Sequence, residues 1–252
     1  MLFLLRNIRR KLMSENKIST YILYAIGEIT LVVIGILIAV QIDDWSQHQT
    51  DRKLEQAYVQ NLKEDLQRDL DLYSTYETNN KWIFEMIDSL SASLKSPDRQ
   101  DQAAKSIFWG RMITMKWMRV EPVQRTYEQM KSSGQLKLIS NKSVADGISD
   151  YYNSIYKLNT YNEAALIWLE NYIDKMGLVF DGGMLLEILK KEQIPASNSG
   201  IFITDNYATI NELITSAQYV YGAIQLSETI TAERKTAAIT LIDLLNQEYE
   251  LD

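Results

Sequence analysis

The stretch YAIGEITLVVIGILIAVQI, Tyr24–Ile42, decides what kind of fold this chain can have. Together with the three residues before it, it forms a 22-residue run, 21–42, in which 13 residues are Leu, Ile or Val. A helix of this length is about 33 Å long, which matches the roughly 30 Å of a bilayer's hydrocarbon core. We therefore expect residues 21–42 to cross a membrane as a single helix.

The run contains one acid, Glu28, near its middle. On insertion scales the aliphatic residues contribute roughly 4–8 kcal/mol, whereas one central charge costs about 2.5–3.5 kcal/mol. Insertion is therefore favourable even when Glu28 is ionised. Tyr21 and Tyr24 at one end, and Trp45 at the other, have amphipathic rings that suit the two membrane interfaces.

Glu28 shares one helical face with residues spaced three or four apart: Leu31, Gly35, Ala39 and Ile42. Gly35 and Ala39 form a small-x-x-x-small pair, which lets a second helix approach closely. Because a carboxyl group in a membrane tends to face protein and not lipid, we expect this face to contact a partner helix. The simplest partner is a second copy of the chain, with Glu28 protonated. The alternative is that Glu28 reaches water toward the cytoplasm.

The charges on either side of the run indicate its orientation. Five basic residues precede it: Arg6, Arg9, Arg10, Lys11 and Lys17. The positive-inside rule then predicts a cytoplasmic N-terminus, with the chain from Asp43 onward across the membrane. That part holds 21 basic and 31 acidic residues, a net charge of −10. Such a domain is poorly suited to nucleic acid or to anionic lipid surfaces, so we expect no nucleic-acid partner.

A cleaved signal peptide is the main alternative for the N-terminal segment. The apolar run is long for a signal peptide, it contains an acid, and "LIAVQ" is a weak match to a small-x-small cleavage site. Before the run, residues 1–20 place Met1, Leu5, Ile8 and Leu12 on one helical face, which predicts a cytoplasmic amphipathic helix on the inner leaflet. A merely basic topogenic tail explains the same residues equally well.

The remaining residues, 43–252, predict an all-α domain. The whole chain has only 10 Gly, 3 Pro and no Cys, which favours long helices and excludes disulfide and zinc-thiolate scaffolds. We expect an extracytoplasmic, periplasmic bundle of long antiparallel helices following the single transmembrane helix. Apolar spacing and capping residues predict helices over about 54–94, 103–118, 121–134, 141–176, 182–195 and 207–249. In the last of these, the polar stretch 227–235 marks a kink or a turn.

Residues that could support chemistry are few. The i, i+4 acids Asp65 and Asp69 could act as metal ligands or as an acid and base, but a solvated face beside Lys63 and Arg68 is the favoured interpretation. The single histidine, His48, lacks partners for a metal or a triad and is interpreted as a surface residue. Aromatic and Met residues between 108 and 118 fit core packing better than a lipophilic pocket.

Two stretches resemble an uncharacterised family common in Bacteroidota, catalogued as domain of unknown function 6090. These are "LLRNIRRKLMSENKISTYILYAIGEITLVVIGILIAVQIDDW", from residue 4, and "TYEQMKSSGQLKLISNKSVADGISDYY", from residue 126. The family often has two Asn where this chain has Asp43 and Asp44, so no role is assigned to those positions. The resemblance implies a single-pass membrane protein of Gram-negative bacteria and implies no activity.

These observations predict an interaction or scaffold protein of the bacterial envelope, anchored in the inner membrane and self-associating through its transmembrane helix. An unidentified envelope protein is a further expected partner, besides the lipid bilayer. No catalytic, cofactor or metal residues are predicted, because no dinucleotide, phosphate-binding or zinc-protease pattern occurs. The alternatives are a periplasmic ligand sensor and a proton-coupled accessory subunit that uses Glu28.

Overall fold

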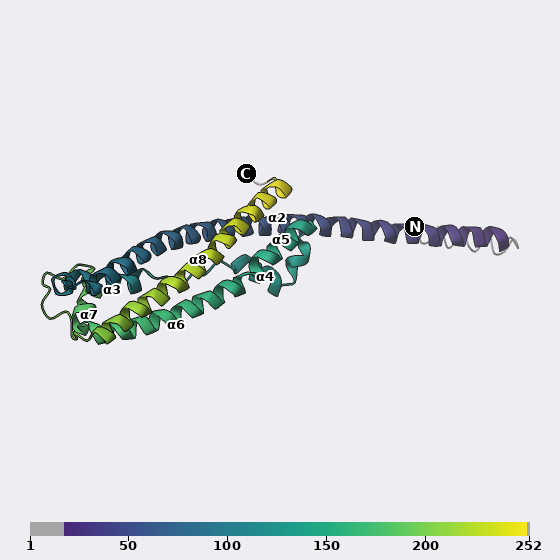
Figure 1. Cartoon of the computed structure of the whole chain (residues 1–252). Helices are drawn as coiled ribbons and strands as arrows, with labels where there is room; N and C mark the ends of the chain where they lie inside the picture. The colour runs from purple at the N-terminus through teal and green to yellow at the C-terminus, as the bar shows by residue number, and fades with distance from the viewer. Residues whose placement is uncertain (1–17, 251–252) are drawn as a thin grey trace. The chain divides into compact units, whose positions relative to one another are not determined.

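The computed structural model describes residues 18–250, and every named element in this range is helical. The longer helices are α2 Ile18–Lys95, α3 Ala103–Lys116, α4 Arg125–Ser132, α5 Lys142–Asn153, α6 Ile155–Val179, α7 Gly182–Lys191 and α8 Tyr207–Tyr249 (Figure 1). Two short 3-10 helices, η1 Arg99–Gln102 and η2 Gln135–Leu138, complete the set. Extended pairing in the described range is limited to one isolated bridge between Phe180 and Phe202. The all-α expectation is therefore confirmed for these residues.

The chain forms two compact units, Met1–Gln56 and Ala57–Asp252, and α2 contributes residues to both. In the described part of the first unit, no residue of the apolar window of α2 is buried among residues 18–250. Its aliphatic side chains are exposed, from Ile22 through to Ile42. Within residues 18–250, α2 is long and apolar enough to cross a membrane. The basic flank of residues 6–17 lies outside the described residues, and for Tyr21 only the helical backbone is described.

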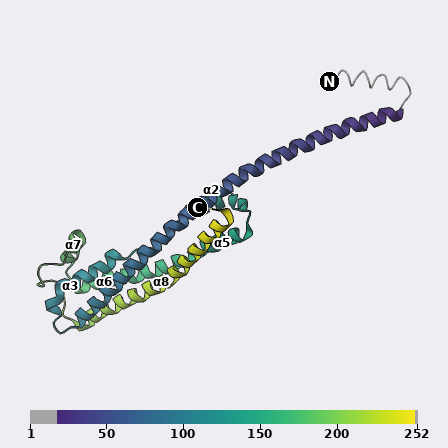
Figure 2. The same cartoon turned by 90° about the horizontal axis from the view of Figure 1, so that it is seen from above.

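The second unit is a bundle in which α6 and α8 lie side by side and run in opposite directions (Figures 1 and 2). The part of α2 after residue 57 runs along the same bundle. Helices α3 and α7 pack together at one end, and α5 packs against α8 at the other. The unit is therefore built from long antiparallel helices, as the spacing of apolar residues predicts.

The main hydrophobic core lies in the half of the bundle that includes α3 and α7. Its buried residues come from several helices, among them Ile87, Ile107, Tyr172, Leu213 and Val220. Phe108, Trp109 and Trp117 pack against this core, and Met112 is buried. The core-packing interpretation of the aromatic and Met residues is therefore confirmed.

The predicted helix ends agree with the structure at several positions. Helix α2 ends at Lys95, two residues before Pro97. Gly134 follows Ser133, the C-cap residue of α4, and has a φ of 68°. This is the left-handed conformation, which glycine adopts without strain. Asn141 caps α5 through its side chain, which accepts the N–H of Val144. Helix α8 runs unbroken through the polar stretch 227–235, so no turn divides it.

The predicted helix over 121–134 begins too early. Helix α3 ends at Lys116, Trp117 is extended with a ψ of 135°, and α4 starts only at Arg125. Residues 117–124 therefore form a non-helical connection, and Pro122 lies within it, not in a first helical turn. Side chains from α2 and α6 bind the backbone of this connection, and no local pattern in 117–124 records those distant partners.

The predicted helix over 141–176 is in fact two helices, α5 and α6, separated at Ser154. The carbonyl of Tyr151 accepts hydrogen bonds from the Ser154 hydroxyl at 2.7 Å and from Nη1 of Arg234 at 3.2 Å. Both donors compete with the helical N–H for that carbonyl, which is a recognised cause of helix interruption. Helix α6 then continues to Val179, so Gly177 does not end it.

Truncation of one core side chain in α8 tests this packing. Ile210 is fully buried, so Ile210→Ala is expected to lower the free energy of unfolding by about 2–5 kcal/mol. Ile239 on the same helix is 46% exposed, and Ile239→Ala is expected to change stability by less than about 0.5 kcal/mol. Chemical denaturation of the intact chain in nonionic detergent, followed by circular dichroism, measures both. Equal losses for the two variants would contradict the burial of the α8 face that contains Ile210.

Candidate functional site

The two acids Asp65 and Asp69 of α2 are fully buried in the second unit. The interpretation of these residues as a solvated face is therefore wrong, although Glu64 and Asp71 are exposed as that interpretation requires. Asp65 follows Leu62 by three positions, and Asp69 precedes Tyr73 by four, so both acids lie on the apolar face of α2. A buried carboxylate needs hydrogen-bond donors, and three other segments of the chain supply them.

Asp65 caps helix α4 from outside that helix. One carboxylate oxygen, Oδ2, accepts the backbone N–H of Thr126 at 3.1 Å and its hydroxyl at 2.6 Å. The other oxygen, Oδ1, accepts a hydrogen bond from the Arg125 guanidinium at 3.0 Å. Gln124, the N-cap residue of α4, makes no side-chain cap bond of its own. The negative charge and the free N–H groups of the first turn therefore meet through a tertiary contact between α2 and α4.

Asp69 binds the connection 117–124 and helix α5. Its Oδ1 accepts the N–H of Val123 at 2.7 Å, and its Oδ2 accepts the hydroxyl of Tyr151 at 2.6 Å. Burial raises the pKa of Asp69 above its ordinary value, and the bonds from Tyr151 and Val123 and the charge of Arg234 offset part of that rise. Burial also raises the pKa of Tyr151, so this phenol stays protonated and its O–H donates a hydrogen bond to the carboxylate.

Arg234 of α8 is the buried cation of the same cluster. Its Nε donates to the Tyr73 hydroxyl at 3.0 Å, and that hydroxyl lies 2.9 Å from the hydroxyl of Tyr151. Its Nη1 donates to Ser154 Oγ as well as to the Tyr151 carbonyl, and its Cζ lies 4.5 Å from the centre of the Tyr151 ring. An arginine only donates and an ionised Asp69 only accepts, so the hydrogen-bond chain has one direction: Arg234 to Tyr73 to Tyr151 to Asp69.

We call Asp65, Asp69, Tyr73, Tyr151 and Arg234 the polar cluster. It joins α2, α4, α5, α8 and the connection 117–124 at one place in the bundle. Each carboxylate oxygen in it already accepts a hydrogen bond. In the described range there is also no group of three or more His, Cys, Asp or Glu side chains able to hold a metal ion. This geometry fits a structural tie between helices better than a reactive pair of acids.

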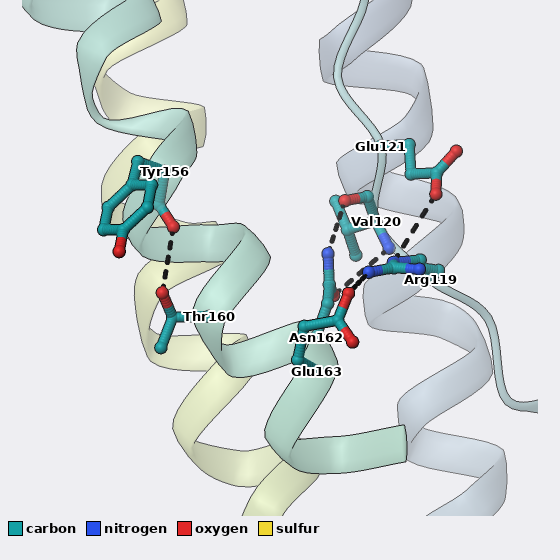
Figure 3. A network of polar contacts seen from close by, with 7 residues as sticks. All are labelled: Arg119, Val120, Glu121, Tyr156, Thr160, Asn162 and Glu163. Atoms are coloured by element: carbon teal, nitrogen blue, oxygen red, sulfur yellow. Dashed lines mark hydrogen bonds and ion pairs between the residues drawn. The ribbon is translucent and has the colours of Figure 1, made fainter. Parts of the chain in front are cut away.

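A second side chain binds the connection 117–124 from the opposite helix. Asn162 of α6 is buried; its Nδ2 donates to the carbonyl of Val120 at 2.8 Å, and its Oδ1 accepts the N–H of Val120 at 3.4 Å (Figure 3). The side-chain amide thus pairs with both backbone groups of one residue. Beside it, Arg119 forms ion pairs with Glu121, at 3.5 Å, and with Glu163 of α6 (Figure 3). The connection is therefore held to α6 at Val120 and to α2 at Val123.

The residues of the predicted transmembrane contact face all belong to the first unit. Glu28 and the other members, Leu31, Gly35, Ala39 and Ile42, are all exposed. Space is open beside Gly35, because a Cβ atom added there would meet no other atom within 4 Å. Tyr24 and Trp45 are exposed too, as are Asp43, Asp44 and His48. This arrangement leaves the face available to a partner and does not test whether a partner binds it.

Sequence reasoning missed Tyr151 and Arg234 of the polar cluster, and also the nearby contacts of Thr126 and Asn162. These residues are too distant from Asp65 and Asp69 in sequence for spacing to relate them. One signal was present: the apolar stripe of α8 continues from Thr231 to Ala238, and Arg234 lies between them at helical spacing. A cation on an apolar face needs a buried acid, and the two acids on the apolar face of α2 are its complement.

Residues 18–250 thus define an all-helical class of protein, in which one apolar segment is long enough to span a membrane and a buried polar cluster joins the helices of a bundle. The model of the Family of unknown function (DUF6090) matches residues 28–204, which is more than half of the chain. The chain therefore belongs to this family, and the resemblance noted in its sequence is confirmed. No curated protein and no solved structure matches it.

Removal of one donor tests the cap on α4. Thr126→Val keeps the shape of the side chain but removes the hydroxyl that Asp65 accepts, so we expect a loss of about 1.5–3 kcal/mol in unfolding free energy. Thr240→Val is the matched control, because this exposed residue bonds only the carbonyl of Thr236. Denaturant titration compares the two variants. A Thr126→Val loss no larger than that of Thr240→Val would contradict the cap.

The raised pKa of Asp69 predicts how stability depends on pH. Because its pKa is higher in the folded protein, the ionised acid costs stability once pH rises through that raised value, whereas a neutral Asn does not. The melting temperature of the native protein relative to Asp69→Asn should therefore fall as pH rises from below about 4 and then level off. The exposed, non-titrating variant Ser74→Ala should show a constant difference over the same range. If the melting temperature of the native protein instead rises relative to that of Asp69→Asn as pH increases, the raised pKa of Asp69 is refuted.

Proposed function

We propose that the chain is a membrane-anchored interaction protein of the bacterial envelope, with residues 21–42 in the inner membrane and the helical bundle in the periplasm. The observation that supports the anchor best is the exposure of its apolar window, none of which is buried among the residues that the structure describes. A core helix of a soluble protein would be mostly buried. Exposed aliphatic surface of this length is stable when lipid or a partner covers it.

The charge distribution supports the orientation. Five basic residues precede the run, whereas the flank after it starts with Asp43 and Asp44. The positive-inside rule then places the N-terminus in the cytoplasm. The bundle supports an interaction role and not catalysis, since its buried acids are used in joining helices.

Cysteine labelling tests the anchor and its orientation, because the native chain has no cysteine to interfere. We expect an impermeant maleimide to label Ser46→Cys in cells whose outer membrane has been made permeable. Ser14→Cys should be labelled only after the inner membrane is broken. Labelling at position 14 alone would reverse the topology. A mature N-terminus near Val40 would replace the anchor with a cleaved signal peptide.

We further propose that the anchor helices self-associate through the face of Glu28, Gly35 and Ala39. Gly35→Leu should block close approach and weaken self-association in detergent or liposomes by about tenfold or more. Val33→Leu presents the same leucine side chain about 160° away around the helix and should have little effect. Glu28→Gln should be mild, since interhelical hydrogen bonds in membranes contribute only about 0.6–2 kcal/mol.

Förster transfer between labelled chains measures the association. Equal effects of Gly35→Leu and Val33→Leu would refute the assigned face. If Glu28→Gln leaves assembly intact and yet abolishes the cellular phenotype of the protein, Glu28 acts as a titrating group. The proton-coupled accessory role would then replace the packing role.

A further inference from the structure

The seam between α6 and α8 has an antiparallel register that two side-chain contacts define. Lys175 of α6 pairs with Glu212 of α8 at 2.7 Å. Seven residues earlier on α6 and seven later on α8, Trp168 stacks on Tyr219 with ring centres 4.5 Å apart. Two contacts separated by one heptad on each antiparallel helix fix the register of the pair. One heptad further along α8 lies Leu226.

The outer side of this seam presents large apolar side chains to solvent. Tyr219 is 52% exposed and Leu226 is 59% exposed, while Trp168 keeps 38% of its surface exposed despite the stacking. Ile167 is 64% exposed but lies about 100° around α6 from Trp168, beside Glu163 and Glu170, so it is not part of this surface. We call Trp168, Tyr219 and Leu226 the seam patch. Trp and Tyr are the residues that contribute most to protein interfaces, because their rings give large contact area at low entropic cost.

Charged residues are absent from this part of the seam. Helix α8 carries no Asp, Glu, Lys or Arg over the 15 residues 213–227. On α6, Glu163 and Glu170 lie about 140° and 160° around the helix from Trp168, so they point away from the seam. Glu163 is also paired with Arg119. An exposed helix surface ordinarily carries charges, and the chain from residue 43 onward has a net charge of −10.

We propose that the seam patch is a contact surface for a second copy of this chain. The absence of charge selects that partner. A basic partner would gain from acids at the contact, and this patch offers none. Two copies of an acidic domain repel each other, so they can associate stably only where neither presents charges to the other. An isologous contact through an uncharged aromatic surface satisfies that condition.

This inference rests on the proposed self-association and adds a second contact to it, outside the membrane. Copies held in one membrane by their N-terminal helices meet at a high effective concentration. A patch of three residues can then contribute measurably even though it is small.

Charge placed in the patch tests the inference in the intact chain. Leu226→Glu sets acids against each other across the contact and should raise the dissociation constant for self-association about tenfold or more. Ile239→Glu is the matched control, because Ile239 is 46% exposed on the same helix and lies about 140° around it. It should change the constant less than about twofold. Both positions are exposed, so both variants should keep the native circular dichroism spectrum.

Crosslinking locates the contact independently of affinity. A short bismaleimide should join Leu226→Cys chains at least about fivefold more efficiently than Ile239→Cys chains in liposomes, with Gly35→Cys reporting the anchor contact in the same preparation. Crosslinking at position 226 without crosslinking at 35 would sustain the seam contact and overturn the anchor face. Crosslinking at 35, with position 226 no better than 239, would overturn the seam contact and leave the proposed function standing. An unchanged dissociation constant in Leu226→Glu would likewise overturn it and assign the patch to a different partner.

Discussion

The burial of two carboxylates on α2 constrains the rest of the bundle. Asp65 and Asp69 are fully buried, and a buried carboxylate without donors is too costly for a protein of ordinary stability. The donors come from residues 54 to 82 positions further along the chain, in α4, α5 and the connection between α3 and α4. The helices therefore pack where these donors reach the acids, and alternative packings that separate them leave charge unpaired.

This constraint explains the two places where the helices depart from their simplest form. The connection 117–124 is non-helical because Asn162 pairs with Val120 and Asp69 accepts the N–H of Val123. The break between α5 and α6 occurs where Arg234 and Ser154 bind the carbonyl of Tyr151. Local sequence favours helix across the second site. The contact from Arg234, 83 positions away from Tyr151, helps to interrupt it.

The sequence predicts the features that depend on local residues and misses those that depend on distant contacts. The helix class, the end of α2 before Pro97, the cap at Asn141 and the start of α8 rest on local signals, and these are confirmed. The cluster depends on which helix faces which, and one sequence holds little information about that. Asp65 and Asp69 were predicted to be solvated because Lys63 and Arg68 are close to them in sequence. The positions of the two acids nevertheless coincide with the apolar stripe of α2. Arg234 in the stripe of α8 was the complementary signal.

The functional proposal follows from what the polar cluster leaves unused. Its acids are occupied in joining helices, so the surfaces open to function are the exposed apolar segment of α2 and the uncharged seam of α6 and α8. Both are exposed apolar surfaces; under the proposal, lipid covers the first and a second copy of the chain covers the second.

Residue-resolved amide hydrogen exchange tests the central claim that the buried acids of α2 hold the bundle together. Val123 lies outside any helix, and Thr126 lies in the first turn of α4, so neither N–H has a helical partner. If Asp69 and Asp65 accept these hydrogens in the folded protein, both amides should exchange at least about a hundredfold more slowly than in an unstructured peptide. The neighbouring amide of Glu121, in the same connection, provides the internal reference. Exchange of Val123 and Thr126 at the unstructured rate would contradict the account, because the acids would then not bind the segments that they are said to join.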